Sequence, residues 1–90
     1  MKVTIDILPA KLLTSLLLAP GWAKTLPDIY AGGKFLSELG ETIEAPIEIE
    51  VTDKYLECVK KALKFHSEAG TIPASPIFVQ LLDLLKIQPL

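Results

Sequence analysis

Residues 47–69 read IEIEVTDKYLECVKKALKFHSEA, and they contain the clearest strand and the clearest helix of the chain. Over residues 47–51, isoleucine and valine alternate with glutamate, so one face is apolar and the other polar, as a half-buried strand requires. Thr52 or Asp53 can cap a helix that continues, without proline or glycine, until Gly70 ends it. The stretch therefore predicts a strand followed directly by a helix of about four turns.

A second helix is predicted downstream, over residues 76–87. Ser75 is a natural N-cap, Pro76 suits the first helical position, and Pro89 prevents continuation. The polar residues of this helix form one narrow stripe, and the rest of its circumference is apolar. Because a domain of this size has little material with which to cover such a terminal helix, we expect part of its apolar surface to contact another chain.

Upstream, residues 2–8 show the same alternation as residues 47–51, so we expect the two segments to lie in one sheet. Pro9 can start a helix whose leucines recur at helical spacing until Pro20 and Gly21 end it. We expect this helix to bury its leucines against the sheet.

Residues 22–40 give a weaker signal, because Pro27, Gly32 and Gly33 interrupt every long pattern. We expect a loop followed by a short helix over residues 35–39. The stretch Gly-Gly-Lys that begins at Gly32 lacks the remaining glycine, the serine and the spacing of a phosphate-binding loop, so we interpret it as a turn.

These elements predict an α/β chain of the α+β type: a small sheet with strands near residues 2–8 and 47–51, packed against about four helices. Ninety residues are enough for one hydrophobic core, and no repeat or low-complexity tract divides them. We therefore expect a single domain over residues 1–90.

Composition excludes several classes of partner. The formal net charge is −2, and all nine basic residues are lysine, so no arginine is present to make bidentate contacts with phosphates or bases. We therefore expect no nucleic-acid partner. No apolar run reaches the roughly 20 residues needed to cross a bilayer, so we expect no membrane partner either.

The expected compartment is the cytoplasm, or the nucleus in a eukaryotic cell. The single Cys58 cannot form an internal disulfide and fits a reducing compartment, where we expect it to be a buried structural thiol. Residues 8–23 imitate the apolar run of a secretory signal, but the charged Asp6 and Lys11 argue against that interpretation.

We find no pattern of catalytic residues or metal ligands. His66, the single histidine, follows Cys58 by eight residues on the predicted helix, which places the two about 12 Å apart and prevents a nucleophile–base pair. A metal site needs clustered cysteine or histidine ligands or converging carboxylates, and neither pattern is found. We therefore expect no enzymatic activity and no cofactor.

Three segments resemble the C-terminal half of a BTB/POZ domain of the short Skp and elongin C type. They read IEIEVTDKYLECVKKALKFH at 47–66, GTIPASP at 70–76 and FVQLLDLLKIQPL at 78–90. In that family a strand leads into a helix rich in aromatic and aliphatic residues. A later helix of the family ends in leucine, a polar residue, isoleucine, two further residues and leucine, which Leu85 to Leu90 match.

The resemblance implies a non-enzymatic protein-interaction adaptor, acting in a ubiquitin-ligase-type assembly or as a homodimer. In such an adaptor the C-terminal helices hold a hydrophobic helix of a partner protein or of a second copy of the chain. By position, five apolar residues would line that contact: Phe65, Phe78, Val79, Leu82 and Leu85.

Two alternatives stand beside the adaptor. One is a small acidic viral or bacterial inhibitor that blocks a target protein through a face including Glu44, Glu48 and Glu50. The other is a self-assembling structural subunit. Apolar docking tolerates salt whereas charge-steered docking does not, so the salt dependence of binding separates the adaptor from the inhibitor.

Overall fold

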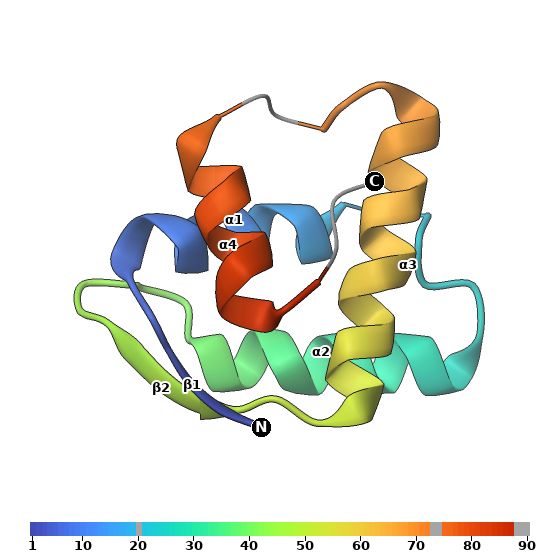
Figure 1. The fold of residues 1–90 in the computed structure, drawn as a ribbon. Helices are drawn as coiled ribbons and strands as arrows, with labels where there is room; N and C mark the ends of the chain where they lie inside the picture. The colour runs from blue at the N-terminus through green and yellow to red at the C-terminus, as the bar shows by residue number, and fades with distance from the viewer. Residues whose placement is uncertain (20, 73–74, 88–90) are drawn as a thin grey trace.

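The sheet and the helices predicted from the sequence are present in the structure, a computed structural model that describes residues 1–19, 21–72 and 75–87 (Figure 1). The predicted α+β class is therefore confirmed. Pro20, residues 73–74 of the family-like segment 70–76 and residues 88–90 of the family-like ending lie outside the described residues. In chain order the elements are β1 (Lys2–Ile5), α1 (Ile7–Leu18), α2 (Leu26–Leu39), β2 (Ile47–Glu50), α3 (Asp53–Ala69) and α4 (Pro76–Leu85).

The two strands pair antiparallel, with Val3 opposite Ile49 and Ile5 opposite Ile47. Ile5 and Ile49 face the core, while the glutamates of β2 lie on the exposed face of the sheet, as the alternation predicts. The prediction that the first strand extends to residue 8 is wrong. Residues 7 and 8 form the first turn of α1 instead, because the N–H groups of a first turn have no helical partner and Pro9 fits there without losing a hydrogen bond.

The largest error of the sequence prediction concerns α2. Residues 26–39 form one continuous helix, where a loop and a short helix were expected. Thr25 caps this helix through its side-chain oxygen, which accepts a hydrogen bond from the backbone N–H of Asp28. Pro27 lies in the first turn, where a missing N–H costs nothing, and the glycines at 32 and 33 are tolerated inside the helix.

The two C-terminal helices end at left-handed residues. In α3 this residue is Gly70, whose φ of 72° closes the helix that Thr52 caps at its start, so this helix is as predicted. In α4 it is Lys86, with a φ of 56°, so the helix stops at Leu85, two residues before the predicted end.

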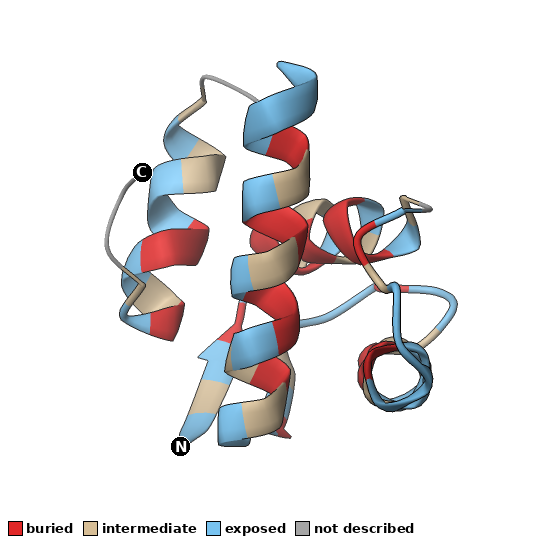
Figure 2. Ribbon diagram, turned by 90° about the vertical axis from the view of Figure 1, so that its right-hand side faces the viewer, coloured by how far each residue is buried: buried red, intermediate tan, exposed pale blue. Residues whose placement is uncertain are grey.

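The core lies where α1 meets the other three helices. This helix packs against α2, α3 and α4, and α4 also contacts β1 (Figure 1). Figure 2, in which α2 is seen nearly along its axis, shows the buried residues of α2 toward the other helices and its exposed residues on the opposite side. In the part of the chain that the structure describes, no helix has the length and apolar character needed to cross a membrane.

Candidate functional site

The structure separates the five residues predicted to bind a partner. Leu82 and Leu85 are almost completely buried, because α4 packs them against α1 and β1, and they offer no surface to another chain. Phe78 is half-buried, and Val79 is the one member of the set that is mostly exposed. Phe65 lies on α3 and lines a groove to which α4 contributes no residue. The fold covers more of α4 than its composition suggested.

A different helix carries an uncovered apolar face. Leu26, Ile29, Tyr30 and Gly33 follow the spacing i, i+3, i+4, i+7 along α2, so they share one side of the helix. Leu26 is 66% exposed, Ile29 52% and Tyr30 74%. Large apolar side chains normally face the core at this spacing, and here they face solvent. We call these four residues the outer face of α2.

The outer face borders a groove between the end of α1 and the side of α2. The groove has a volume of about 360 Å³, and Leu18, the last residue of α1, lies beside it with 64% of its surface exposed. Apart from Asp28, the residues that line this groove are apolar or glycine. We call it the α1–α2 groove. The residues that line it are Leu17, Leu18, Ala19, Gly21, Trp22, Ala23, Asp28, Ile29, Gly32, Gly33 and Leu36.

Trp22 fixes the shape of the α1–α2 groove. Its indole N–H donates a hydrogen bond to the carbonyl oxygen of Leu17 at 2.9 Å, and its ring is buried against Gly32. A Cβ atom at position 32 would lie 2.8 Å from the ring, so only glycine allows the helix to approach this closely. The segment between α1 and α2 is therefore held by packing and by a buried hydrogen bond.

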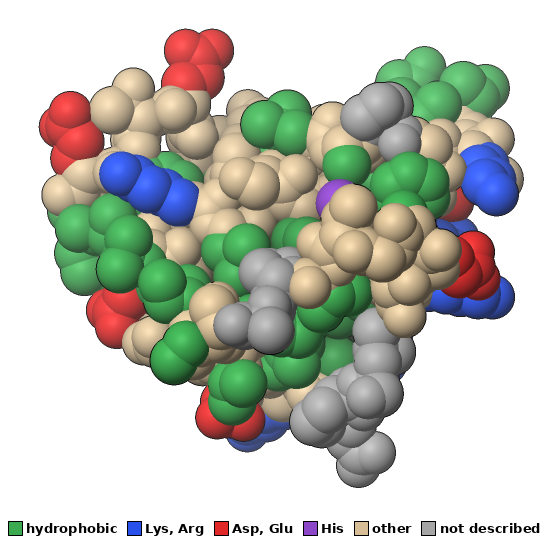
Figure 3. Space-filling view, turned by 90° about the horizontal axis from the view of Figure 1, so that it is seen from above, with side chains coloured by type: hydrophobic (Ala, Val, Ile, Leu, Met, Phe, Trp, Pro, Cys, Tyr) green, Lys and Arg blue, Asp and Glu red, His purple; other side chains and the backbone are tan. Residues whose placement is uncertain are grey.

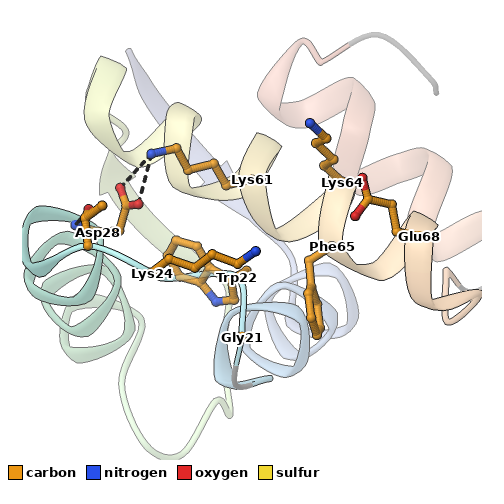
Figure 4. A pocket seen from close by; sticks show the side chains of 9 residues that line it. Gly21, Trp22, Lys24, Asp28, Lys61, Lys64, Phe65 and Glu68 are labelled. Carbon is orange, nitrogen blue, oxygen red and sulfur yellow. Dashed lines mark hydrogen bonds and ion pairs between the residues drawn. The ribbon is translucent and has the colours of Figure 1, made fainter.

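An ion-pair cluster holds the inner side of α2 to α3. The carboxylate of Asp28 is almost fully buried and accepts hydrogen bonds from Lys61 at 2.9 Å to both oxygens (Figure 4). It accepts a further hydrogen bond from Lys54 at 3.0 Å. The Lys61 and Lys54 ammonium groups lower the pKa of Asp28 to about 2. Glu57 joins the cluster by pairing with both lysines, and these pairs lower its own pKa. The cluster is satisfied internally, so we assign it a structural role.

A second groove, of about 350 Å³, lies on the other side of the segment between α1 and α2 (Figure 4). Trp22 and Phe65 line it together with three lysines, Lys24, Lys61 and Lys64. Lys61 already donates hydrogen bonds to the Asp28 carboxylate, and Glu68 adds a negative charge to the lining of the groove. This mixed lining does not select one charge of ligand, so the groove is a weaker candidate.

His66 and Cys58 are both buried, and we assign each a structural role. His66 is buried on α3, where Nε2 donates to the carbonyl oxygen of Leu16 at 3.1 Å and Nδ1 lies 2.7 Å from the Thr71 hydroxyl. Figure 3 shows the histidine as a small area between other side chains. Cys58 is fully buried, as predicted, and burial raises the pKa of its thiol. Within the described ranges, no three cysteine, histidine or acidic side chains are close enough to hold a metal ion.

The sequence analysis missed the outer face because it divided α2 at the glycines. One signal could have found it: Thr25 and Pro27 form a helix start, and the apolar spacing then runs through Leu26, Ile29 and Tyr30. A helix start followed by that spacing outweighs the weak helix propensity of glycine, which costs only about 1 kcal/mol per residue.

Comparison with known proteins adds no relative. No protein-family model matches the chain. No curated protein and no solved structure shows significant similarity to it. The functional argument therefore depends on the surfaces described above.

Proposed function

We propose that this chain is a protein-interaction module that docks an apolar helix across the outer face of α2 and the adjoining α1–α2 groove. One observation carries the proposal: Leu18, Leu26, Ile29 and Tyr30 are all more than half exposed, and they gather around the groove and the adjoining face of α2. The interaction role expected from the sequence is kept. The docking surface moves from the C-terminal helices to α2, because two of the residues expected on α4 are buried in the core.

The size of the exposed surface supports this role. With more than half of their surface exposed, these four side chains together present roughly 500 Å² of apolar area. That value reaches the upper range of the largest apolar patch on an ordinary monomer, about 300–600 Å², where such a patch is often functional. A groove beside a helix, lined by apolar residues, is the usual receptor for an amphipathic helix.

The acidic face considered for an inhibitor is less favourable. Glu48 pairs with Lys2 at 3.0 Å, and Glu50 pairs with the amino group of Met1 at 3.2 Å. These pairs neutralise part of the negative charge that would have to steer a target protein. Among the residues that the structure describes, the apolar surface of α2 has no such internal partner, so it is the better basis for binding.

The proposal is tested by comparing three baits in affinity purification from the producing cells, followed by quantitative mass spectrometry. Wild type and a Val79→Asp variant, changed on α4, should enrich the same proteins. An Ile29→Asp variant should lose them, because a charge in the desolvated groove costs several kcal/mol of binding free energy. Circular dichroism of the purified baits checks that all three are folded.

The opposite pattern would contradict the proposal. If Val79→Asp removes the bound proteins and Ile29→Asp keeps them, the docking surface lies on α4. If both variants enrich the same proteins as wild type, neither apolar surface carries the interaction.

A further inference from the structure

We infer that the helix docked on the outer face of α2 is α2 of a second copy of this chain, in antiparallel orientation across a two-fold axis. This inference rests on the proposed function and names its partner. It follows from the shape of the outer face, which carries both halves of one contact.

The two halves are Tyr30 and Gly33. Tyr30 is the most exposed large apolar side chain in the described part of the chain, and Gly33 lies one turn further along the same side. Apart from its chain neighbours and the backbone of its own helix, no described heavy atom lies within 4 Å of the position that the Cβ of residue 33 would occupy. One residue therefore projects and the other leaves a hollow. A two-fold axis that passes beside the outer face, level with the midpoint between residues 31 and 32, places each Tyr30 ring on the partner's Gly33, and both contacts form at once.

The same axis brings the remaining apolar residues of the outer face together. Residues near the centre of the outer face whose numbers sum to about 63 face each other in this register, so Leu26 lies against the partner's Ser37, and Ile29 lies at the flank of the contact. The small side chains at 33 and 37 allow the two helix axes to approach to the short end of the usual range of about 8–10 Å.

The expected affinity is moderate. Two copies would bury on the order of 1,000 Å² of total surface, the lower limit for a specific interface. We therefore expect a dimer with a Kd in the micromolar range. Sedimentation velocity of the wild-type chain from about 5 to about 500 µM should show a monomer–dimer equilibrium in that range.

A Gly33→Leu variant tests the hollow without damaging the fold. Position 33 is surrounded by open space, and leucine forms helix better than glycine, so the monomer should stay folded with an equal or higher Tm. The filled hollow can no longer accept Tyr30, and the dimer should weaken at least tenfold. A Lys60→Ala variant, changed at an exposed residue of α3, is the control and should dimerise like wild type.

Cysteine pairing tests the orientation. In an oxidised mixture of Leu26→Cys and Ser37→Cys proteins, a disulfide should join the two different chains, because positions 26 and 37 face each other. Neither variant alone should cross-link, since each position lies roughly 16 Å from its own symmetry mate. Wild type, whose single cysteine is buried, is the control. Cross-linking of each variant with itself would indicate a parallel pair and would overturn the inference.

The remaining outcomes separate this inference from the proposed function. A wild-type chain that stays monomeric at about 500 µM, while Ile29→Asp still loses a bound protein, overturns the self-pairing and leaves the groove as a docking site. A dimer that tolerates both Gly33→Leu and Ile29→Asp overturns the inference, because its contact lies elsewhere.

Discussion

The two sides of α2 have similar apolar character, but one side is buried in the core and the other is exposed to solvent. On the inner side, Gly32 and Phe35 are buried beneath Trp22 and against Tyr55. On the outer side, Tyr30 and Gly33 face solvent. The glycines at 32 and 33 are neighbours in sequence, yet one touches the indole ring and the other has open space around it.

This difference separates residues that the fold needs from residues that it does not use. The inner side is complementary to the chain's own core, because the indole ring occupies the space that a side chain at 32 would fill. The outer side carries large apolar groups that the described residues leave exposed. Apolar patches that a monomer leaves exposed often mark interaction sites, and this is the basis of the proposed docking surface.

The largest expected effect is the loss of the Phe35 ring from the inner side. Phe35 is completely buried and stacks on Tyr55 with ring centroids 4.3 Å apart. A Phe35→Ala variant should lose about 3–5 kcal/mol of the free energy of unfolding, because it leaves a cavity in the core. Tyr30→Ala on the outer side is the matched control and should change this free energy by at most about 0.5 kcal/mol in dilute solution.

Urea unfolding followed by circular dichroism measures both values. Similar losses in the two variants would show that the outer face contributes to the folded monomer, and the contrast between the two sides of α2 would fail.

The second prediction concerns the contact between Gly32 and the indole ring. In a Gly32→Ala variant the new methyl group would lie 2.8 Å from Trp22, and the ring cannot move away without losing its hydrogen bond to Leu17. Overpacking of this kind costs about 1–3 kcal/mol and outweighs the better helix propensity of alanine. We expect a lower Tm and a change in tryptophan fluorescence. A variant as stable as wild type would mean that the ring is not fixed.

Sequence reasoning predicted the strand of residues 47–50 and the helix that begins at Asp53, because local alternation and caps specify both elements. It failed for α2, because it treated the glycines at 32 and 33 as breaks, whereas Gly32 lies inside the helix and allows close contact with Trp22, ten residues earlier. It also expected an exposed apolar surface on α4. There the outcome depends on whether α1 and β1 cover the leucines, which is a property of the assembled fold.

The candidate site could therefore be predicted only in part from the sequence. The apolar spacing through Leu26, Ile29 and Tyr30 is a local signal and could have been found. Its exposure could not, since the same spacing describes a buried face equally well. Only the three-dimensional arrangement shows that Phe35 and Leu39 face the core and leave the other side of α2 free.

The third prediction concerns the Asp28 carboxylate, the one buried charge on the inner side of α2. Its pKa is about 2 in the folded chain and 3.8 without its partners, so between these values the unfolded chain binds more protons. The stability that Asp28 contributes is therefore fully present above about pH 4 and is lost as the pH falls toward 2. Glu57, whose pKa is also lowered, loses its contribution in the acidic range as well.

Thermal unfolding of wild type and Asp28→Asn between pH 7 and pH 2 checks this. The variant should have a lower Tm at pH 7, and the difference from wild type should shrink as the pH falls. A Glu57→Gln variant shows how much of the remaining slope belongs to the more exposed carboxylate. A difference in Tm that does not change with pH would show that the charge of Asp28 is not what holds α2 to α3.

The smallest effect is expected at Gly33, and its sign is opposite to that of Gly32. Alanine at position 33 meets no neighbouring atom and has a better helix propensity than glycine by about 1 kcal/mol, so Gly33→Ala should stabilise the monomer by up to that amount. For a domain of this size the Tm should rise by about 4–8 °C per kcal/mol.

Scanning calorimetry of wild type and Gly33→Ala at low and high protein concentration gives the sharpest test. The rise should be largest in dilute solution and should shrink at high concentration, where wild type gains stability from pairing and the variant gains less. The same rise at both concentrations would leave the open space at Gly33 without a function, and a fall in both would show that this side of α2 is packed after all.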